Sequence, residues 1–173
     1  MNNRNFILLI IISVLTNFVR LTYEVLKHKK IIEASKLSFA IMFTNMAALW
    51  ISWFLLCSAD IYRLNLPLFV RYIGFAITLS GTGLFFTALF TIKTLETYSG
   101  NLITNGIYSR LRHPMYLGFI CWLFGAPVFY QAITSFALGI LFIANVLYWR
   151  HLEEFELEKR FAGYKTYRLR TFF

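Results

Sequence analysis

Long apolar stretches separated by short polar ones run through the sequence. Residues 6–26, 37–57 and 68–92 form three such stretches, each close to the ~20 residues that cross a bilayer as a helix. The first is interrupted by Asn17 and Arg20, and Pro67 precedes the third. We predict a membrane-spanning helix in each stretch.

The stretch from residue 113 to residue 149 contains no Asp, Glu, Lys or Arg. Because Pro127 and Gln131 lie near its middle, we predict a helical hairpin with a tight turn at 127–131 and two short arms of roughly 16–19 residues. A charged helix at 150–161 and a polar tail are expected to follow. The pattern therefore predicts an all-α integral membrane protein with five transmembrane helices.

Composition supports this class. Hydrophobic residues make up 58% of the chain and charged residues 14%, whereas soluble domains carry about 25% charged residues. A soluble domain and a disordered chain are therefore excluded. We expect one membrane domain over residues 1–173, in which 1–92 hold three spans, 93–167 a motif-bearing core with the hairpin, and 168–173 a tail.

The charges along the chain predict an orientation. If the C-terminus lies inside, 13 of the 17 Lys and Arg residues are cytoplasmic, three are outside and Arg20 is within a span. This is the distribution that the positive-inside rule describes, so we expect the N-terminus outside, the C-terminus inside and any active site facing the cytoplasm. The same rule accounts for the net charge of +9, so no nucleic acid is expected as a partner.

Two polar segments on the predicted cytoplasmic side could carry chemistry. In the first, Asn105-Gly106 is a turn signal and Pro114 suits the first turn of a helix. His113 then lies beside a helix N-terminus, whose free N–H groups attract carboxylates. The alternative is a juxtamembrane loop whose Arg and Tyr side chains anchor to headgroups.

The second polar segment follows the last span. Glu153 and Glu154 are adjacent carboxylates at a membrane boundary, which is costly unless they are solvated or used. Arg150 and Glu154 are four residues apart and share a helix face. The alternative is an ordinary solvated helix.

Within the third span, Gly81-Thr82-Gly83 favours close helix packing over a nucleotide loop. Neither cysteine lies in a metal-ligand spacing, so no metal is expected.

Together these segments resemble the isoprenylcysteine carboxyl methyltransferase family. The resemblance rests on Gly106-x-Tyr108, Arg112-His113-Pro114-x-Tyr116-x-Gly118, the hairpin and Glu153-Glu154-x-x-Leu157. The resemblance covers roughly residues 93–167. The family belongs to a wider superfamily that includes the phospholipid N-methyltransferases. The resemblance implies a membrane enzyme that transfers a methyl group from S-adenosyl-L-methionine (SAM) to a lipid or lipidated acceptor entering from the bilayer, and that leaves S-adenosyl-L-homocysteine as product.

The resemblance also implies residue roles. Arg150 and Glu154 are the implied catalytic residues, with Arg150 receiving the acceptor carboxylate. One of Glu153 and Glu154 binds the methionine ammonium of SAM, and the choice stays open. The implied cofactor contacts are Lys93, Asn101, Leu102, Ile103, Tyr108, His113, Pro114, Tyr116, Glu153 and Glu154. Gly81 and Gly83 match a Gly-x-Gly cofactor motif of phospholipid methyltransferases.

Three other functions compete with a prenylcysteine carboxyl methyltransferase. A phospholipid ethanolamine N-methyltransferase needs a base to deprotonate its amine, and Arg150 suits a carboxylate better than an ammonium. An NADPH-dependent membrane reductase of the sterol type shares an Arg-His-x-x-Tyr motif, but such proteins are usually much longer. A non-enzymatic membrane scaffold would leave the clustered ionisable residues unexplained.

Overall fold

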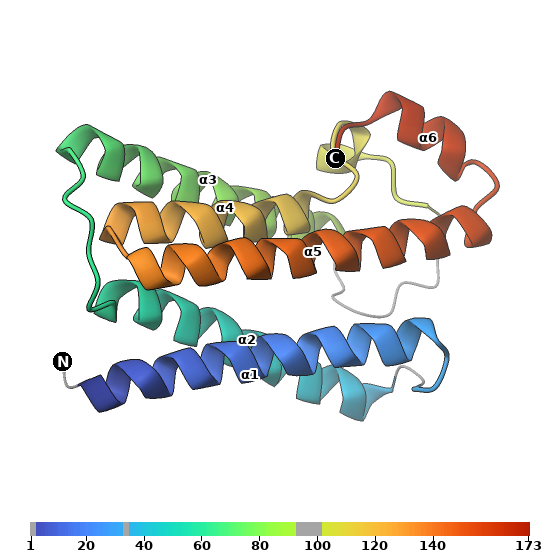
Figure 1. Ribbon diagram of the computed structural model, residues 1–173. Coiled ribbons are helices and arrows are strands. Elements are labelled where there is room, and N and C mark those ends of the chain that lie inside the picture. The colour runs from blue at the N-terminus through green and yellow to red at the C-terminus, as the bar shows by residue number, and fades with distance from the viewer. Residues whose placement is uncertain (1–2, 33–34, 93–101) are drawn as a thin grey trace.

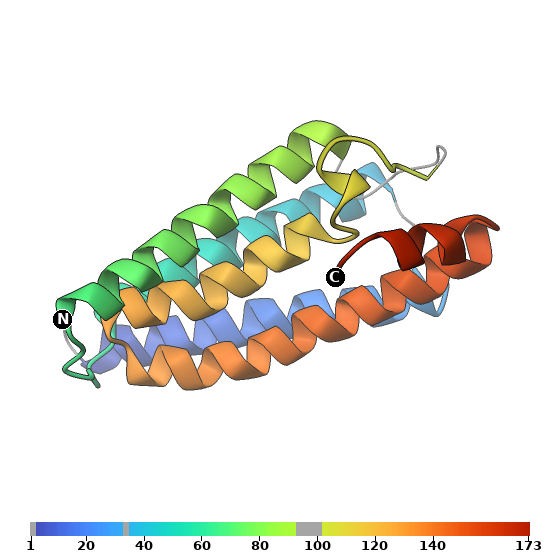
Figure 2. The same ribbon diagram turned by 90° about the horizontal axis from the view of Figure 1, so that it is seen from above.

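A computed structural model describes residues 3–32, 35–92 and 102–173, and within these ranges every regular element is a helix. The long helices form a bundle in which consecutive helices run in opposite directions (Figures 1 and 2). The elements are α1 (Asn3–His28), α2 (Lys36–Ala59), α3 (Leu68–Ile92), the short 3₁₀ helix η1 (Gly106–Ser109), α4 (Pro114–Tyr130), α5 (Ile133–Arg160) and α6 (Tyr164–Arg170).

Four of these helices, α1, α2, α3 and α5, are long and apolar enough to cross a membrane. The fifth apolar helix, α4, has 17 residues. The prediction of an all-α, multi-pass membrane protein is therefore confirmed. Five spans, and the side on which each terminus lies, stay predictions.

The predicted hairpin is present between α4 and α5. Its turn lies at Gln131, which adopts the left-handed conformation with φ 63°, and Pro127 lies inside the last turns of α4. The charged segment predicted as a separate helix at 150–161 is instead the C-terminal part of α5, which continues to Arg160. No Gly or Pro interrupts the helix there, so the chain keeps its helical hydrogen bonds after the apolar stretch ends.

The start of α5 is capped from another helix. Its own N-cap residue is Ala132, which has no side-chain acceptor. Asp60, at the end of α2, accepts hydrogen bonds from the Ser135 backbone N–H (2.8 Å) and from the Ser135 hydroxyl (3.0 Å). Asp60 is only 2% exposed, so this carboxylate links α2 to α5 inside the protein.

Helices α3 and α4 are held close together by glycines. A Cβ atom at Gly81 would lie 2.7 Å from the Gly118 carbonyl oxygen, and one at Gly74 would lie 2.8 Å from that of Gly125. Gly83 has nothing within 4 Å of such an atom. The packing predicted for the Gly81-Thr82-Gly83 segment is thus confirmed at Gly81 but not at Gly83, which does not face α4.

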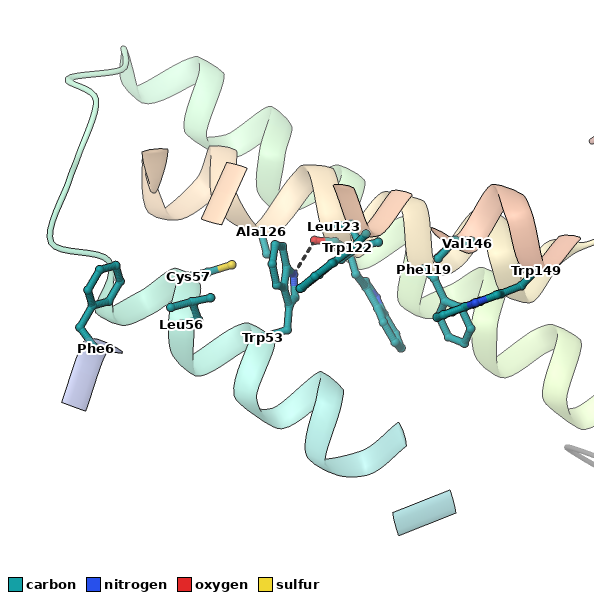
Figure 3. Packing of buried hydrophobic residues seen from close by; sticks show 11 residues of the cluster. Phe6, Trp53, Leu56, Cys57, Phe119, Trp122, Leu123, Ala126, Val146 and Trp149 are labelled. Atoms are coloured by element: carbon teal, nitrogen blue, oxygen red, sulfur yellow. Dashed lines mark hydrogen bonds between the residues drawn. The ribbon is translucent and has the colours of Figure 1, made fainter. Parts of the chain in front are cut away.

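The apolar core joins α2, α4 and α5 around three tryptophans (Figure 3). The Trp53 indole donates a hydrogen bond to the Trp122 carbonyl oxygen at 3.3 Å, and the Trp122 indole donates to the Thr82 hydroxyl at 2.9 Å. Trp149 extends the core along α5. The positions of α4 and α5 are therefore fixed at the end of the bundle where the polar motifs lie.

Candidate active site

The polar motifs gather at one end of the bundle, where η1, the start of α4, the end of α5 and α6 meet, far from the N-terminus (Figures 1 and 2). The C-terminal residues hold the motif loop in place. The Arg112 backbone N–H donates to the Phe172 carbonyl oxygen at 3.0 Å, and the Phe172 N–H donates to that of Arg110 at 2.8 Å. The Tyr167 hydroxyl donates to the Tyr108 carbonyl oxygen at 2.6 Å.

The Arg112 side chain ties three elements together. Its Nε donates to Glu154 Oε1 at 3.1 Å. Its Nη1 donates to the carbonyl oxygens of Thr171, at 2.6 Å, and Arg168, at 3.0 Å. Because these donors are already engaged inside the protein, Arg112 acts mainly as a link between the motif loop, α5 and α6.

His113 lies buried between the two glutamates. Its Nδ1 is 3.6 Å from Glu153 Oε2, and its Nε2 is 3.4 Å from Glu154 Oε1. Burial alone lowers the pKa of His113, but the two carboxylates outweigh burial and raise the pKa above the ordinary value of 6.5. The surroundings of this ring therefore favour the imidazolium form.

The structure separates the two glutamates. Glu154 is 8% exposed, contacts Arg112 and His113, and is absent from the lining of both cavities described below. The side chain of Glu153 is 46% exposed and lines both cavities. Both carboxylates contact His113, but Glu154 also pairs with Arg112 and lines neither cavity, whereas the more exposed Glu153 faces both cavities and can reach a ligand.

The first cavity has a volume of about 220 Å³ and a lining rich in charged and tyrosine side chains. It is formed by the end of α1, the motif loop, the end of α5 and α6. Its lining residues are Glu24, Lys27, His28, Ile92, Leu102, Ile103, Tyr108, Arg112, Tyr116, Leu152, Glu153, Glu156, Leu157, Arg160, Phe161, Tyr164 and Tyr167.

The second cavity has a volume of about 410 Å³ and a mainly aromatic and methionine-rich lining. It lies among α1, α2, α3 and α4. Its lining residues are Arg20, Phe39, Met42, Phe43, Met46, Ala47, Trp50, Phe85, Ile92, Tyr108, Arg112, His113, Met115, Tyr116, Phe119 and Glu153. The two cavities adjoin, because they share Ile92, Tyr108, Arg112, Tyr116 and Glu153.

Most of the predicted cofactor residues meet here. Leu102, Ile103, Tyr108, Tyr116 and Glu153 line the first cavity, and His113 lines the second. Pro114, the first residue of α4, is buried and lines neither cavity. Lys93 and Asn101 lie outside the described residues.

Arg150 lies apart from this group. It lines neither cavity, and its guanidinium carbon lies 4.7 Å from the centre of the Phe173 ring. Its assignment as the receiver of the acceptor carboxylate stays a prediction.

Sequence reasoning missed the contribution of α1. Arg20 lines the second cavity, Glu24, Lys27 and His28 line the first, and Arg20 forms an ion pair with Glu24 one helical turn away. The signal was present in the sequence, because an Arg and a Glu spaced by four residues are unusual near a membrane span.

Comparison with known families adds an independent finding. Residues 69–163, more than half of the chain, match the phospholipid methyltransferase family. The match begins at α3 and ends after α5, so it includes the motif loop and leaves α1 and α2 outside. No curated protein and no solved structure matches the chain.

Proposed function

The chain belongs to the phospholipid methyltransferase family, and on that basis we propose that this membrane methyltransferase uses SAM to methylate a lipid-borne acceptor. The proposed acceptor group is the carboxylate of a prenylcysteine-like substrate. One observation carries the proposal. A polar cavity and an apolar cavity adjoin at Glu153, Tyr108 and Tyr116, which suits two substrates that arrive from water and from the bilayer.

We assign the first cavity to the cofactor. The Glu153 carboxylate fits the methionine ammonium, because it is accessible and opposite in charge. Leu102, Ile103 and Tyr108 offer an apolar and aromatic wall for the adenosine. Lys93 and Asn101 remain proposed contacts on the strength of the resemblance, and S-adenosyl-L-homocysteine is the proposed product.

Glu154 is proposed to act through other residues. It touches Arg112 and His113, which belong to the motif loop and the start of α4. Its carboxylate therefore positions that loop beside Glu153. Losing Glu154 should loosen the loop and reduce stability, because it removes contacts with both Arg112 and His113. Losing Glu153 should weaken cofactor binding and reduce stability less, because its one ion pair among the described residues is with His113.

The chemistry proposed for the site is mainly alignment. SAM supplies a methyl group on a positively charged sulfur, and a carboxylate acceptor is already ionised at neutral pH, so no general base is required. The residues at the junction of the cavities hold the two substrates in line, which is a proximity effect. The apolar lining of the second cavity excludes water and strengthens the attraction between acceptor and sulfonium.

A phospholipid ethanolamine N-methyltransferase is the second candidate, and the family match favours it. Its amine must lose a proton before it accepts a methyl group. His113 is a poor base for this step, because its raised pKa favours the protonated ring. Glu153 is the accessible carboxylate at the junction, and it could act as the base only if another group held the methionine ammonium of SAM.

We also propose five spans, with the N-terminus outside and the active site facing the cytoplasm. The positive-inside distribution supports this, and so does the alternating direction of five consecutive helices (Figure 1). Reporters fused ahead of the N-terminus and after Phe173 should label on opposite sides of the membrane. Labelling on one side would contradict the five-span arrangement.

Ligand binding tests the proposed cofactor. The detergent-purified protein should gain about 2.7 kcal/mol of stability when SAM is present at 100 times its dissociation constant, whereas NADPH should give no shift. Glu153→Gln should weaken SAM binding by roughly 1.5–3 kcal/mol, the range for a hydrogen bond to a charged group. Glu154→Gln is the matched control. It should lower the melting temperature more than Glu153→Gln does, and it should weaken SAM binding less. Unchanged SAM affinity in Glu153→Gln would overturn the assignment of the ammonium site.

A further inference from the structure

Helix α1 lies outside the region that matches the family, yet it forms part of both cavities. Arg20 lines the second, apolar cavity, and Glu24, one turn further along α1, lines the first, more polar cavity. The ion pair between them therefore lies where the two cavities approach each other. Its position links an element without a recognised motif to the proposed reaction.

The Arg20 guanidinium is a charged group in a largely apolar cavity, and its contacts among the described residues are the Glu24 carboxylate and the Trp149 ring, whose centre lies 5.7 Å from the guanidinium carbon. The residues that α2 contributes to the cavity are apolar, as are most of those from α3 and α4: Phe39, Met42, Phe43, Met46, Ala47, Trp50, Phe85, Met115 and Phe119. A charged side chain within a membrane span is costly and is usually retained for a function. Arg20 thus marks one place in an apolar cavity where a negative charge is favoured.

Arg20 makes fewer hydrogen bonds than Arg112, the other arginine in this cavity. The Arg112 side chain donates to Glu154 and to two backbone carbonyl oxygens. Arg20 contacts Glu24 through one terminal nitrogen, and its buried Nε has no hydrogen-bond partner among the described residues. A guanidinium carries five N–H donors in a planar fork, which suits a bidentate oxyanion.

We infer that Arg20 binds the anionic group of the methyl acceptor in the apolar cavity, and that Glu24 holds the guanidinium in position for it. The acceptor is therefore an anionic amphiphile, in which either a carboxylate or a phosphodiester meets Arg20 while the hydrocarbon chain lies among the aromatic and methionine side chains. This inference rests on the proposed function, and it assigns to Arg20 the role that the resemblance assigned to Arg150.

Binding of matched charged and uncharged amphiphiles, measured without SAM, tests the inference separately from methyl transfer. N-acetyl-S-farnesylcysteine is compared with its uncharged methyl ester, and a lysophosphatidylglycerol, whose only charge is the phosphodiester anion, with the monoacylglycerol of the same chain. The wild-type protein should bind the charged member of at least one pair about tenfold or more tightly, which corresponds to the lower range for a hydrogen bond to a charged group. The pair that shows the preference identifies the anion as carboxylate or phosphodiester.

Variants then show which residue is responsible for the preference for the charged amphiphile. Arg20→Met should abolish it, and Arg20→Lys should keep part of it because an ammonium retains the charge but not the planar fork. Since Arg20→Met leaves Glu24 without its partner, the double variant Arg20→Met/Glu24→Leu removes both charges and protects the fold. Arg150→Met tests the competing assignment, and the preference for the charged amphiphile should persist in it because Arg150 lines neither cavity.

The results that overturn the inference are distinct from those that overturn the proposed function. Equal binding of both members of both pairs by the wild-type protein would contradict an anion site. A preference that survives in both Arg20→Met and Arg20→Met/Glu24→Leu, or that disappears in Arg150→Met, would contradict the assignment to Arg20. Failure to bind SAM would overturn the cofactor proposal alone, because the amphiphile measurements contain no SAM.

Discussion

The glycine contact between α3 and α4 gives a prediction with an internal control. Gly81→Ala adds one methyl group that would lie 2.6 Å from the Cys121 Cβ atom and 2.7 Å from the Gly118 carbonyl oxygen. Ordinary contacts begin at 3.4 Å, and neither neighbour is the end of a flexible side chain. The two helices must therefore move apart locally. Gly83→Ala adds the same methyl group to the same helix, where nothing lies within 4 Å.

The difference between the two variants isolates the steric effect. Both replacements gain a similar amount of helix propensity, up to about 1 kcal/mol, so this gain cancels when they are compared. Overpacking a well-packed interface costs about 1–3 kcal/mol. Gly81→Ala should therefore be less stable than Gly83→Ala by about 1–3 kcal/mol, with the Gly83→Ala protein at least as stable as wild type.

Titration of the detergent-purified proteins with a denaturing detergent, followed by tryptophan fluorescence, measures this difference. Trp122 is one of the four tryptophans that give the signal, and it lies at the contact, since it donates a hydrogen bond to Thr82 between the two glycines. Equal midpoints for the two variants would refute the reasoning, because they would show that α3 and α4 separate without cost.

Two further predictions concern polar groups. Asp60→Ala should destabilise the protein by about 1–3 kcal/mol, the cost of leaving a buried donor unpaired. Ser58→Ala, at an exposed position of the same helix, should change the melting temperature little. Similar melting temperatures for the two variants would argue against the cap on α5. The raised pKa of His113 implies that its ion pairs stabilise the folded state fully below pH 6.5. This contribution to the free energy of unfolding is lost as the pH rises through the folded-state pKa. The difference in unfolding free energy between wild type and His113→Gln should therefore narrow as the pH rises from 6.5 through the raised folded-state pKa of His113, and a difference that widens would contradict the charged state of the ring.

The spans were predictable because hydrophobicity and helix length are linked in a membrane. The α3 bounds, Leu68–Ile92, coincide with the apolar stretch, since Pro67 precedes it and suits a helix start. The end of α5 was not predictable in the same way. Hydrophobicity marks where a chain leaves the bilayer, whereas a helix continues until its hydrogen bonds are interrupted, and none of the residues between Trp149 and Arg160 interrupts them.

The candidate site was partly predictable for a similar reason. The predicted topology and the resemblance grouped Glu153 and Glu154 with the motif loop, but neither tells which carboxylate meets an internal partner. That choice depends on Arg112, which approaches from 42 residues away in the sequence. The Arg150 guanidinium likewise lies against the ring of Phe173, a contact that helical periodicity could not indicate.

The division of the site between two parts of the chain has a consequence for specificity. The region that matches the family supplies Tyr108, Tyr116 and Glu153, which line both cavities. Outside that region, α2 supplies much of the apolar lining of the larger cavity, and α1 supplies Arg20. If the proposed roles hold, cofactor chemistry is carried by the shared core, and the choice of acceptor by α1 and α2. Substitutions in the first two helices should then change which amphiphile binds while leaving SAM affinity intact, which is the separation that the Arg20 and Glu153 variants measure.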